Sequence, residues 1–138
     1  MVNVNDSSEP PTAKPPAPQA TCVLACSGCS RAGELADRIA RRLQELGLAR
    51  MSCLAGVGGR VKSIMNTVQR APELLMIDGC PLECGANTLR LAGVTEFHHL
   101  KLHLLGVSKH ETEVTSETVQ ALVESAGTRL SGVINVAK

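Results

Sequence analysis

The chain has 138 residues, and its 14 Lys and Arg against 13 Asp and Glu give a formal net charge of +1. A length of this order is typical of one domain, and the near-neutral charge gives no electrostatic basis for binding nucleic acid or an anionic membrane. Phe97 is the single aromatic residue, so the stacking surfaces that bind single-stranded nucleic acid are missing. No apolar run approaches the ~18 residues of a membrane-spanning helix. The composition therefore argues against nucleic-acid and membrane partners.

The two ends of the chain differ from its middle in composition and hydrophobic pattern. Residues 1–20 hold five of the seven prolines and show almost no apolar periodicity, which predicts a disordered Pro-rich tail. This segment lacks a cationic start followed by an apolar run, so we expect no secretory signal and a cytoplasmic protein. A single α/β domain that carries the cysteines is predicted over 21–131, and the sequence assigns no structure to the tail at 132–138.

The first half of the domain predicts two strands, each followed by a helix. TCVLA at 21–25 is a short apolar run of strand-forming residues. A helix follows, with Ser30 as its cap and Gly47 closing it, and its apolar stripe consists of Leu35, Ile39, Leu43 and Leu46. LARMSCLAG at 48–56 predicts a second strand that runs into a Gly-rich turn at 56–59. The helix after this turn ends before Pro72, and its inward residues are Val61, Ile64, Met65 and Val68.

The second half repeats this alternation. ELLMID at 73–78 predicts a buried strand, and Pro81 suits the first position of a third helix that runs to Gly93. The segment 94–105 predicts a fourth strand, with leucines on one face and histidines and a lysine on the other. A last amphipathic helix over 115–130 begins at Thr115 or Ser116. The whole pattern predicts a small three-layer doubly wound α/β fold: a mostly parallel sheet of about four strands with crossover helices.

The spacing of the cysteines is the main functional signal. Cys26, Cys53 and Cys80 lie 27 residues apart, and each follows a predicted strand. Because the carboxyl ends of parallel strands meet at one edge of a sheet, we expect these three residues to converge. Cys84 lies one helical turn after Cys80 and can point back toward it. Four thiolates match tetrahedral zinc, although they also hold iron–sulfur clusters.

The charge of such a centre requires compensation, and two further cysteines require an assignment. Helix N-termini, Arg31 and Lys109 are the candidate positive groups. Cys22 lies four residues before Cys26 in the same strand, about 13 Å away at about 3.3 Å per residue, so we assign it to the core. Cys29 forms a CxxC motif with Cys26, and it is an additional ligand, a resolving thiol or neither.

Acidic and histidine side chains near the third and fourth strands are weaker candidates. Asp78 lies two residues before Cys80, so we expect both side chains on the same face of the strand. This favours Asp78 as a hydrogen-bond acceptor beside the site, and capping of the next turn is equally compatible. His98, His99 and His103 resemble a cluster of metal ligands. The alternation of His99 and His103 with leucines favours a solvated strand face instead.

Four motifs together resemble a known family. They are CSG at 26–28, MSCLAG at 51–56, IDGCPLEC at 77–84 and GVSK at 106–109. The stretch from Val23 to about Val123 is similar to the DGC family of zinc-binding proteins, which takes its name from the tripeptide seen here at 78–80. The resemblance implies a zinc held by four matching cysteines, Cys26, Cys53, Cys80 and Cys84. It lends no support to Cys22 or Cys29, and it implies no reaction.

Three functions follow from these observations. The first is a small cytoplasmic metal-binding protein with a cysteine–zinc site at the carboxyl edge of the sheet, its protein partner and any catalysis left open. The second is a thiol–disulfide oxidoreductase that uses Cys26 and Cys29, which the CxxC motif favours and the absence of Trp disfavours. The third is an iron–sulfur carrier, which uses the same thiolates as the zinc site.

Overall fold

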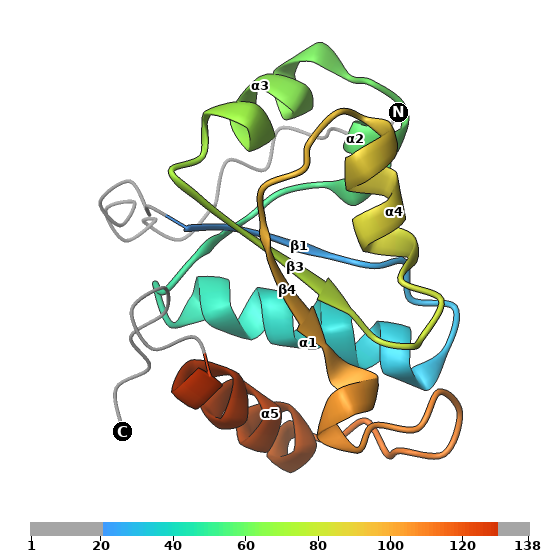
Figure 1. The fold of residues 1–138 in the computed structure, drawn as a ribbon. Coiled ribbons are helices and arrows are strands. Elements are labelled where there is room, and N and C mark those ends of the chain that lie inside the picture. Colours follow the sequence, from blue (N-terminus) through green and yellow to red (C-terminus); the bar gives the residue numbers. More distant parts are fainter. Residues whose placement is uncertain (1–20, 130–138) are drawn as a thin grey trace, which may run out of the picture.

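A computed structural model describes residues 21–129 of the chain, which form a parallel sheet covered by helices (Figure 1). The sheet has four strands in the order β2-β1-β3-β4, and all three pairings are parallel. The strands are β1 (Thr21–Ala25), β2 (Arg50–Met51), β3 (Glu73–Asp78) and β4 (His98–Lys101). In this order the chain passes from β1 to its neighbour β2 on one side, and from β3 to its neighbour β4 on the opposite side. Ligands of doubly wound folds bind where the strand order reverses, here between the ends of β1 and β3.

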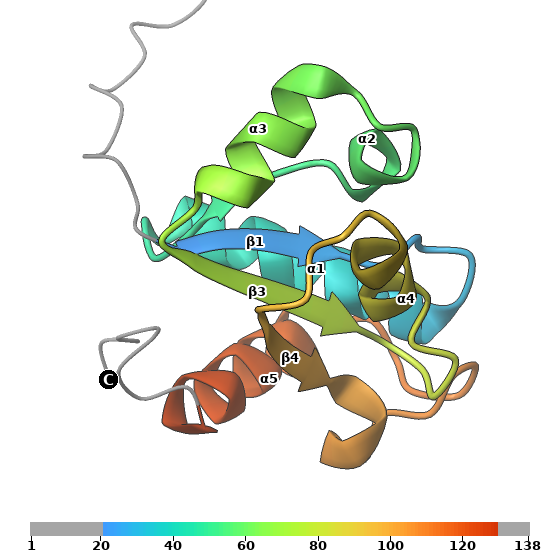
Figure 2. The same cartoon turned by 45° about the horizontal axis from the view of Figure 1, so that its top comes forward.

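Helices cover both faces of this sheet. They are α1 (Arg31–Glu45), α2 (Leu54–Gly58), α3 (Lys62–Arg70), α4 (Cys84–Leu91) and α5 (Ser116–Arg129), with a short 3-10 helix η1 at Leu102–Leu105. Figures 1 and 2 show α1 and α5 on one face and α2, α3 and α4 on the other. The predicted three-layer α/β architecture with a parallel sheet is therefore confirmed.

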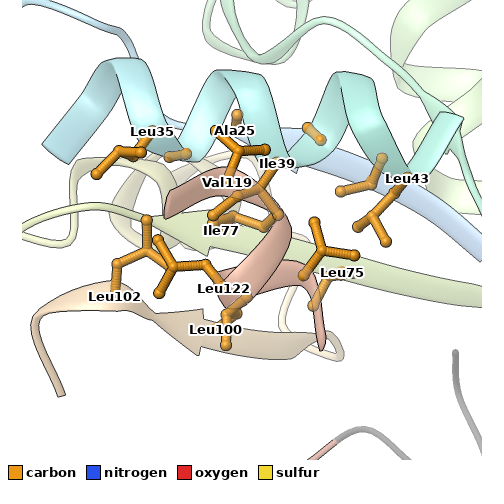
Figure 3. Close-up of a cluster of buried hydrophobic side chains, with 14 of the residues drawn as sticks. Ala25, Leu35, Ile39, Leu43, Leu75, Ile77, Leu100, Leu102, Val119 and Leu122 are labelled. Carbon is orange, nitrogen blue, oxygen red and sulfur yellow. The ribbon is translucent and has the colours of Figure 1, made fainter. Parts of the chain in front are cut away.

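Two apolar cores fill the space between the layers, because successive strand residues point to opposite faces. Ala25, Leu75 and Ile77 face α1 and α5 and meet the helical stripe of Leu35, Ile39 and Leu43 (Figure 3). On the other face, Cys22, Leu24, Leu74 and Met76 pack with α2, α3 and α4. Cys22 is 5% exposed, which confirms its assignment to the core.

Several predicted element ends are confirmed by hydrogen bonds and backbone angles. The Ser30 hydroxyl accepts a hydrogen bond from Gly33 N at 3.1 Å and caps α1. Gly47 follows this helix with a φ of 71°, the left-handed conformation that favours glycine at such ends. Thr115 Oγ1 accepts from Thr118 N at 3.1 Å, so Thr115 caps α5.

Four predicted elements differ from the structure. β2 is only two residues long, and the Gly-rich turn predicted at 56–59 mostly belongs to the helix α2. Gly56 allows this helix to pack closely on α3, since a Cβ there would overlap the Ile64 side chain. The third helix begins at Cys84 rather than Pro81. The fourth strand ends at Lys101, where η1 replaces its predicted second half. The tails predicted at 1–20 and 132–138 lie outside the described residues.

Candidate functional site

Cys26 lies at the point where the strand order reverses. It follows β1 directly, its backbone N–H donates to the Ile77 carbonyl of β3 at 3.0 Å, and its Sγ accepts a hydrogen bond from Gly79 N at 3.4 Å. The pKa of the Cys26 thiol is raised from 9.0 to about 11, chiefly by burial; the Gly79 hydrogen bond lowers it, and the nearby Asp78, Cys80 and Cys84 add to the rise. In the absence of a bound cation, Cys26 is therefore protonated at neutral pH.

Two glycines allow the turn after β3, the first turn of α1 and the loop after β1 to pack closely: Gly79 brings the turn against α1, and Gly33 brings α1 against the loop. A Cβ at Gly79 would overlap the backbone of Ala32 in the first turn of α1. A Cβ at Gly33 would lie 2.7 Å from the Ser27 carbonyl oxygen. Figures 1 and 2 both show these two connections side by side at the carboxyl edge of the sheet. The close approach places Cys80 beside the loop that carries Cys26 and Cys29.

Four cysteines line a small cavity at this edge. Its volume is about 130 Å³, and the cysteines in its wall are Cys26, Cys29, Cys80 and Cys84. Asp78, Lys109 and Leu82 also line it. Cys29, a sequence candidate only for an additional role, thus shares a cavity with three of the four predicted ligands.

Cys53 lies in an adjoining, wider groove of about 900 Å³. Cys26 and Cys84 line this groove as well as the small cavity, so the two spaces share one wall. The Sγ of Cys53 accepts a hydrogen bond from Gly56 N at 3.4 Å, which places the residue as the N-cap of α2. Arg41 and Arg50 line the same groove. Five of the six cysteines therefore gather at one edge of the sheet, in two neighbouring spaces.

All six cysteines are free thiols. Within residues 21–129, no group of three or more His, Cys, Asp or Glu side chains is already arranged to hold a metal ion. The donors themselves are of the kind that zinc and other thiophilic metals prefer. Ligation of zinc by Cys26, Cys53, Cys80 and Cys84 thus stays a prediction.

Asp78 has a defined structural role beside the cavity. Its carboxylate accepts hydrogen bonds from Gly85 N at 2.8 Å and Ala86 N at 3.0 Å, the first free amides of α4. His99 Nε2 lies 2.7 Å from the second carboxylate oxygen. Since the side chain of Asp78 is 2% exposed, this is a buried, fully engaged carboxylate. Asp78 therefore caps α4, which is one of the two roles that the sequence allowed for it.

The predicted solvated face of histidines is wrong for His99, whose side chain is 12% exposed and bonded to Asp78. The neighbouring His98 pairs at 2.8 Å with Glu73, and both side chains are more than 40% exposed. His103 lies in η1, and in the described part of the chain its buried Nδ1 has no hydrogen-bond partner. Sequence patterns missed the Asp78–His99 pair because the register of β4 against β3 decides it.

The predicted positive groups are placed unequally around the cavity. Lys109 lines the cavity, and its backbone carbonyl accepts a hydrogen bond from Ala32 N at 3.2 Å. Arg31 is exposed at the start of α1 and lines neither the cavity nor the groove. The first amides of α4 are already bound by Asp78. Lys109 is therefore the better placed of the two candidate cations.

Comparison with known proteins assigns the chain: the DGC domain matches residues 22–126. The chain belongs to the DGC domain family. This DGC domain is also 42% identical over 91 residues to the anaerobic and virulence modulator AnvM of Pseudomonas aeruginosa, an alignment that covers 66% of this chain and 70% of that relative. No solved structure matches the chain at a significant level. Among the described residues of this DGC domain, no helix is long and apolar enough to cross a membrane.

Proposed function

We propose that this DGC-domain protein is a small metal-binding protein that holds zinc through cysteine thiolates at the carboxyl edge of its sheet. The observation that carries the proposal is the gathering of five cysteines around the point where the strand order reverses. Burial, together with the nearby Asp78, Cys80 and Cys84, raises the pKa of Cys26 to about 11 and so disfavours its thiolate in the metal-free protein. A divalent cation would supply the positive charge that stabilises this thiolate, since a coordinating thiol is deprotonated by the metal.

The proposed ligands are Cys26, Cys53, Cys80 and Cys84. Cys26 and Cys84 line both spaces, so Cys80 approaches this pair from the cavity and Cys53 from the groove. Four thiolates saturate zinc and leave no open position for a water or a substrate. Such a centre is structural or regulatory, and we place the protein in the cytoplasm because its thiols must stay reduced. The name of the curated relative, a modulator, is consistent with regulation.

A thiol–disulfide oxidoreductase is the second candidate, favoured by the position of Cys29 in the same cavity as Cys26. Redox dithiols usually contain a thiol whose pKa is lowered, because the thiolate is the nucleophile. Burial instead raises the pKa of Cys26 to about 11. This contrast ranks the metal site above the dithiol, and it leaves Cys29 as the exposed thiol of the pair.

Elemental analysis of the natively purified protein tests the proposal. We expect one equivalent of zinc in the wild type and in Cys22→Ser, whose thiol lies in the core, and loss of zinc in Cys53→Ser and Cys84→Ser. Iron in place of zinc, with a brown colour under anaerobic purification, would identify a cluster carrier instead. Full zinc content in Cys53→Ser together with mixed disulfides trapped at Cys26 in Cys29→Ser would favour the oxidoreductase.

A further inference from the structure

The turn that carries Cys80 and Cys84 is held from the neighbouring strand β4. Asp78, the last residue of β3, accepts a hydrogen bond from Gly85 N with Oδ1 and one from Ala86 N with Oδ2, and Oδ2 also lies 2.7 Å from Nε2 of His99 in β4. Cys84 is the first residue of α4, directly before Gly85. The position of Cys84 is therefore coupled through one buried carboxylate to a histidine that does not line the cavity.

A second contact from β4 acts on the same turn. Lys101 Nζ lies 2.6 Å from Glu83 Oε1, and this hydrogen bond lowers the pKa of the Glu83 carboxyl. Glu83 immediately precedes α4 and has a φ of 51°, a left-handed conformation that costs a non-glycine residue energy. The Lys101 contact helps to keep Glu83 in this conformation, so alternate residues of β4 fix both sides of the start of α4.

The start of α4 also has no room to shift toward the sheet. A Cβ at Gly85 would overlap the Met76 side chain and would lie 2.8 Å from Asp78 Oδ1. The helix can therefore move only outward, away from β3, and the Asp78 hydrogen bonds oppose that movement. Outward movement would carry Cys84 away from Cys26 and Cys80.

We propose that the Asp78–His99 pair is the positioning unit of the cysteine site, which holds Cys84 against Cys26 and Cys80 by tying the start of α4 to β4. His99 acts through Asp78: it donates to the carboxylate, fixes its rotamer and leaves the other lone pairs for Gly85 N and Ala86 N. The zinc part of this inference rests on the proposed function. The positioning part concerns the thiol cluster whatever it binds.

The chain offers closely matched variants for the test. His99→Phe keeps a ring against Phe97, whose centroid lies 5.9 Å from that of His99, but removes the donor to Asp78. His99→Gln restores a donor near the position of Nε2. His98→Phe removes the exposed pair with Glu73 from the same strand. Val68→Ala weakens the core beneath α3, near the start of β3, at a residue that lines neither the cysteine cavity nor the groove.

Two measurements on the 138-residue protein give separate answers. Amide hydrogen exchange of the metal-free protein reports Gly85 and Ala86 directly, and we expect faster exchange in His99→Phe, with near wild-type exchange in His99→Gln and His98→Phe. Zinc affinity, measured by chelator competition well below the melting temperature, should fall roughly 10- to 100-fold in His99→Phe, the usual effect of losing a group that orients ligands. His99→Gln should restore most of this affinity.

Each result decides between positioning and simpler roles. Wild-type exchange at Gly85 and Ala86 in His99→Phe would overturn the proposal. Faster exchange with unchanged zinc affinity would mean that the pair only caps the helix, which also overturns the proposal. An equal loss of zinc affinity in Val68→Ala would mean that general instability causes the loss, and this too overturns the proposal. If the wild type itself binds no zinc, the proposed function fails, and the exchange of the two amides alone decides the positioning claim.

Discussion

Replacing Asp78 by Asn perturbs a buried polar group with three hydrogen-bond partners while nearly keeping its shape. The carboxylate accepts from Gly85 N, Ala86 N and His99, and its side chain is 2% exposed. An amide offers one accepting oxygen and places an NH₂ group where the other oxygen stood. At least one of the two buried amides, or His99 in its donor tautomer, then faces a donor instead of an acceptor.

The expected loss of stability follows from these contacts. Leaving one buried donor without an acceptor costs about 1–3 kcal/mol, and hydrogen bonds to a charged group contribute about 1.5–3 kcal/mol against about 1 kcal/mol for neutral ones. Because the amide changes both, we expect Asp78→Asn to lower the free energy of unfolding by about 3 kcal/mol. This is less than the ~5–15 kcal/mol stability typical of a domain, so the variant should still fold.

Urea unfolding of the wild type and the variant measures this loss. Asp37→Asn is the matched control, because Asp37 pairs with Arg41 on the surface of α1 and its side chain is 37% exposed. Surface pairs of this kind contribute about 0–1 kcal/mol. A loss in Asp78→Asn no larger than that in Asp37→Asn would refute the claim that the buried carboxylate organises the start of α4.

Three further predictions concern the cysteines and the turn between them. Cys22→Ser should leave zinc content unchanged but lower stability by about 1–3 kcal/mol, because it buries a hydroxyl in the core; a lost zinc equivalent would place Cys22 in the site. The free energy of unfolding of the metal-free protein should fall as pH rises from 9 toward 11, because the pKa of Cys26 is raised from 9.0 to about 11 in the folded state, so the unfolded chain loses this proton first. The part of that fall due to Cys26 should vanish in Cys26→Ser. An unchanged pH profile in that variant would contradict a raised pKa of Cys26 as its cause. Gly79→Ala should destabilise the fold by about 1–3 kcal/mol or more through overlap with Ala32, and thermal melting at the wild-type temperature would show that the two loops do not pack as described.

The sequence predicted the sheet because its signals were local. TCVLA and ELLMID are runs of buried residues between clear turns, and the stripe of α1 has helical spacing with Ser30 and Gly47 at its ends. The strand ends then follow from topology, which is why Cys26 and Cys80 were expected at one edge. The errors lie where tertiary contacts decide, as in α2, whose glycines read as a turn but allow packing on Ile64.

The gathering of cysteines at the carboxyl edge was predictable from the sequence, but the contacts that hold the surrounding residues in place were not. Spacing alone brought Cys26, Cys53 and Cys80 to the carboxyl edge, yet it did not indicate that Cys53 opens onto a groove while Cys29 lines the cavity. His99 read as a surface residue because its strand alternates with leucines. Its contact with Asp78 depends on the pairing of β3 with β4, in which Asp78 lies opposite Lys101, and no local pattern encodes that register.

The most direct test of the central claim is the zinc K-edge X-ray absorption spectrum of the protein loaded with one equivalent of zinc. A site made of Cys26, Cys53, Cys80 and Cys84 predicts four sulfur neighbours at about 2.3 Å and no shell of lighter atoms. A spectrum dominated by nitrogen or oxygen neighbours at about 2.0–2.1 Å would contradict the thiolate site.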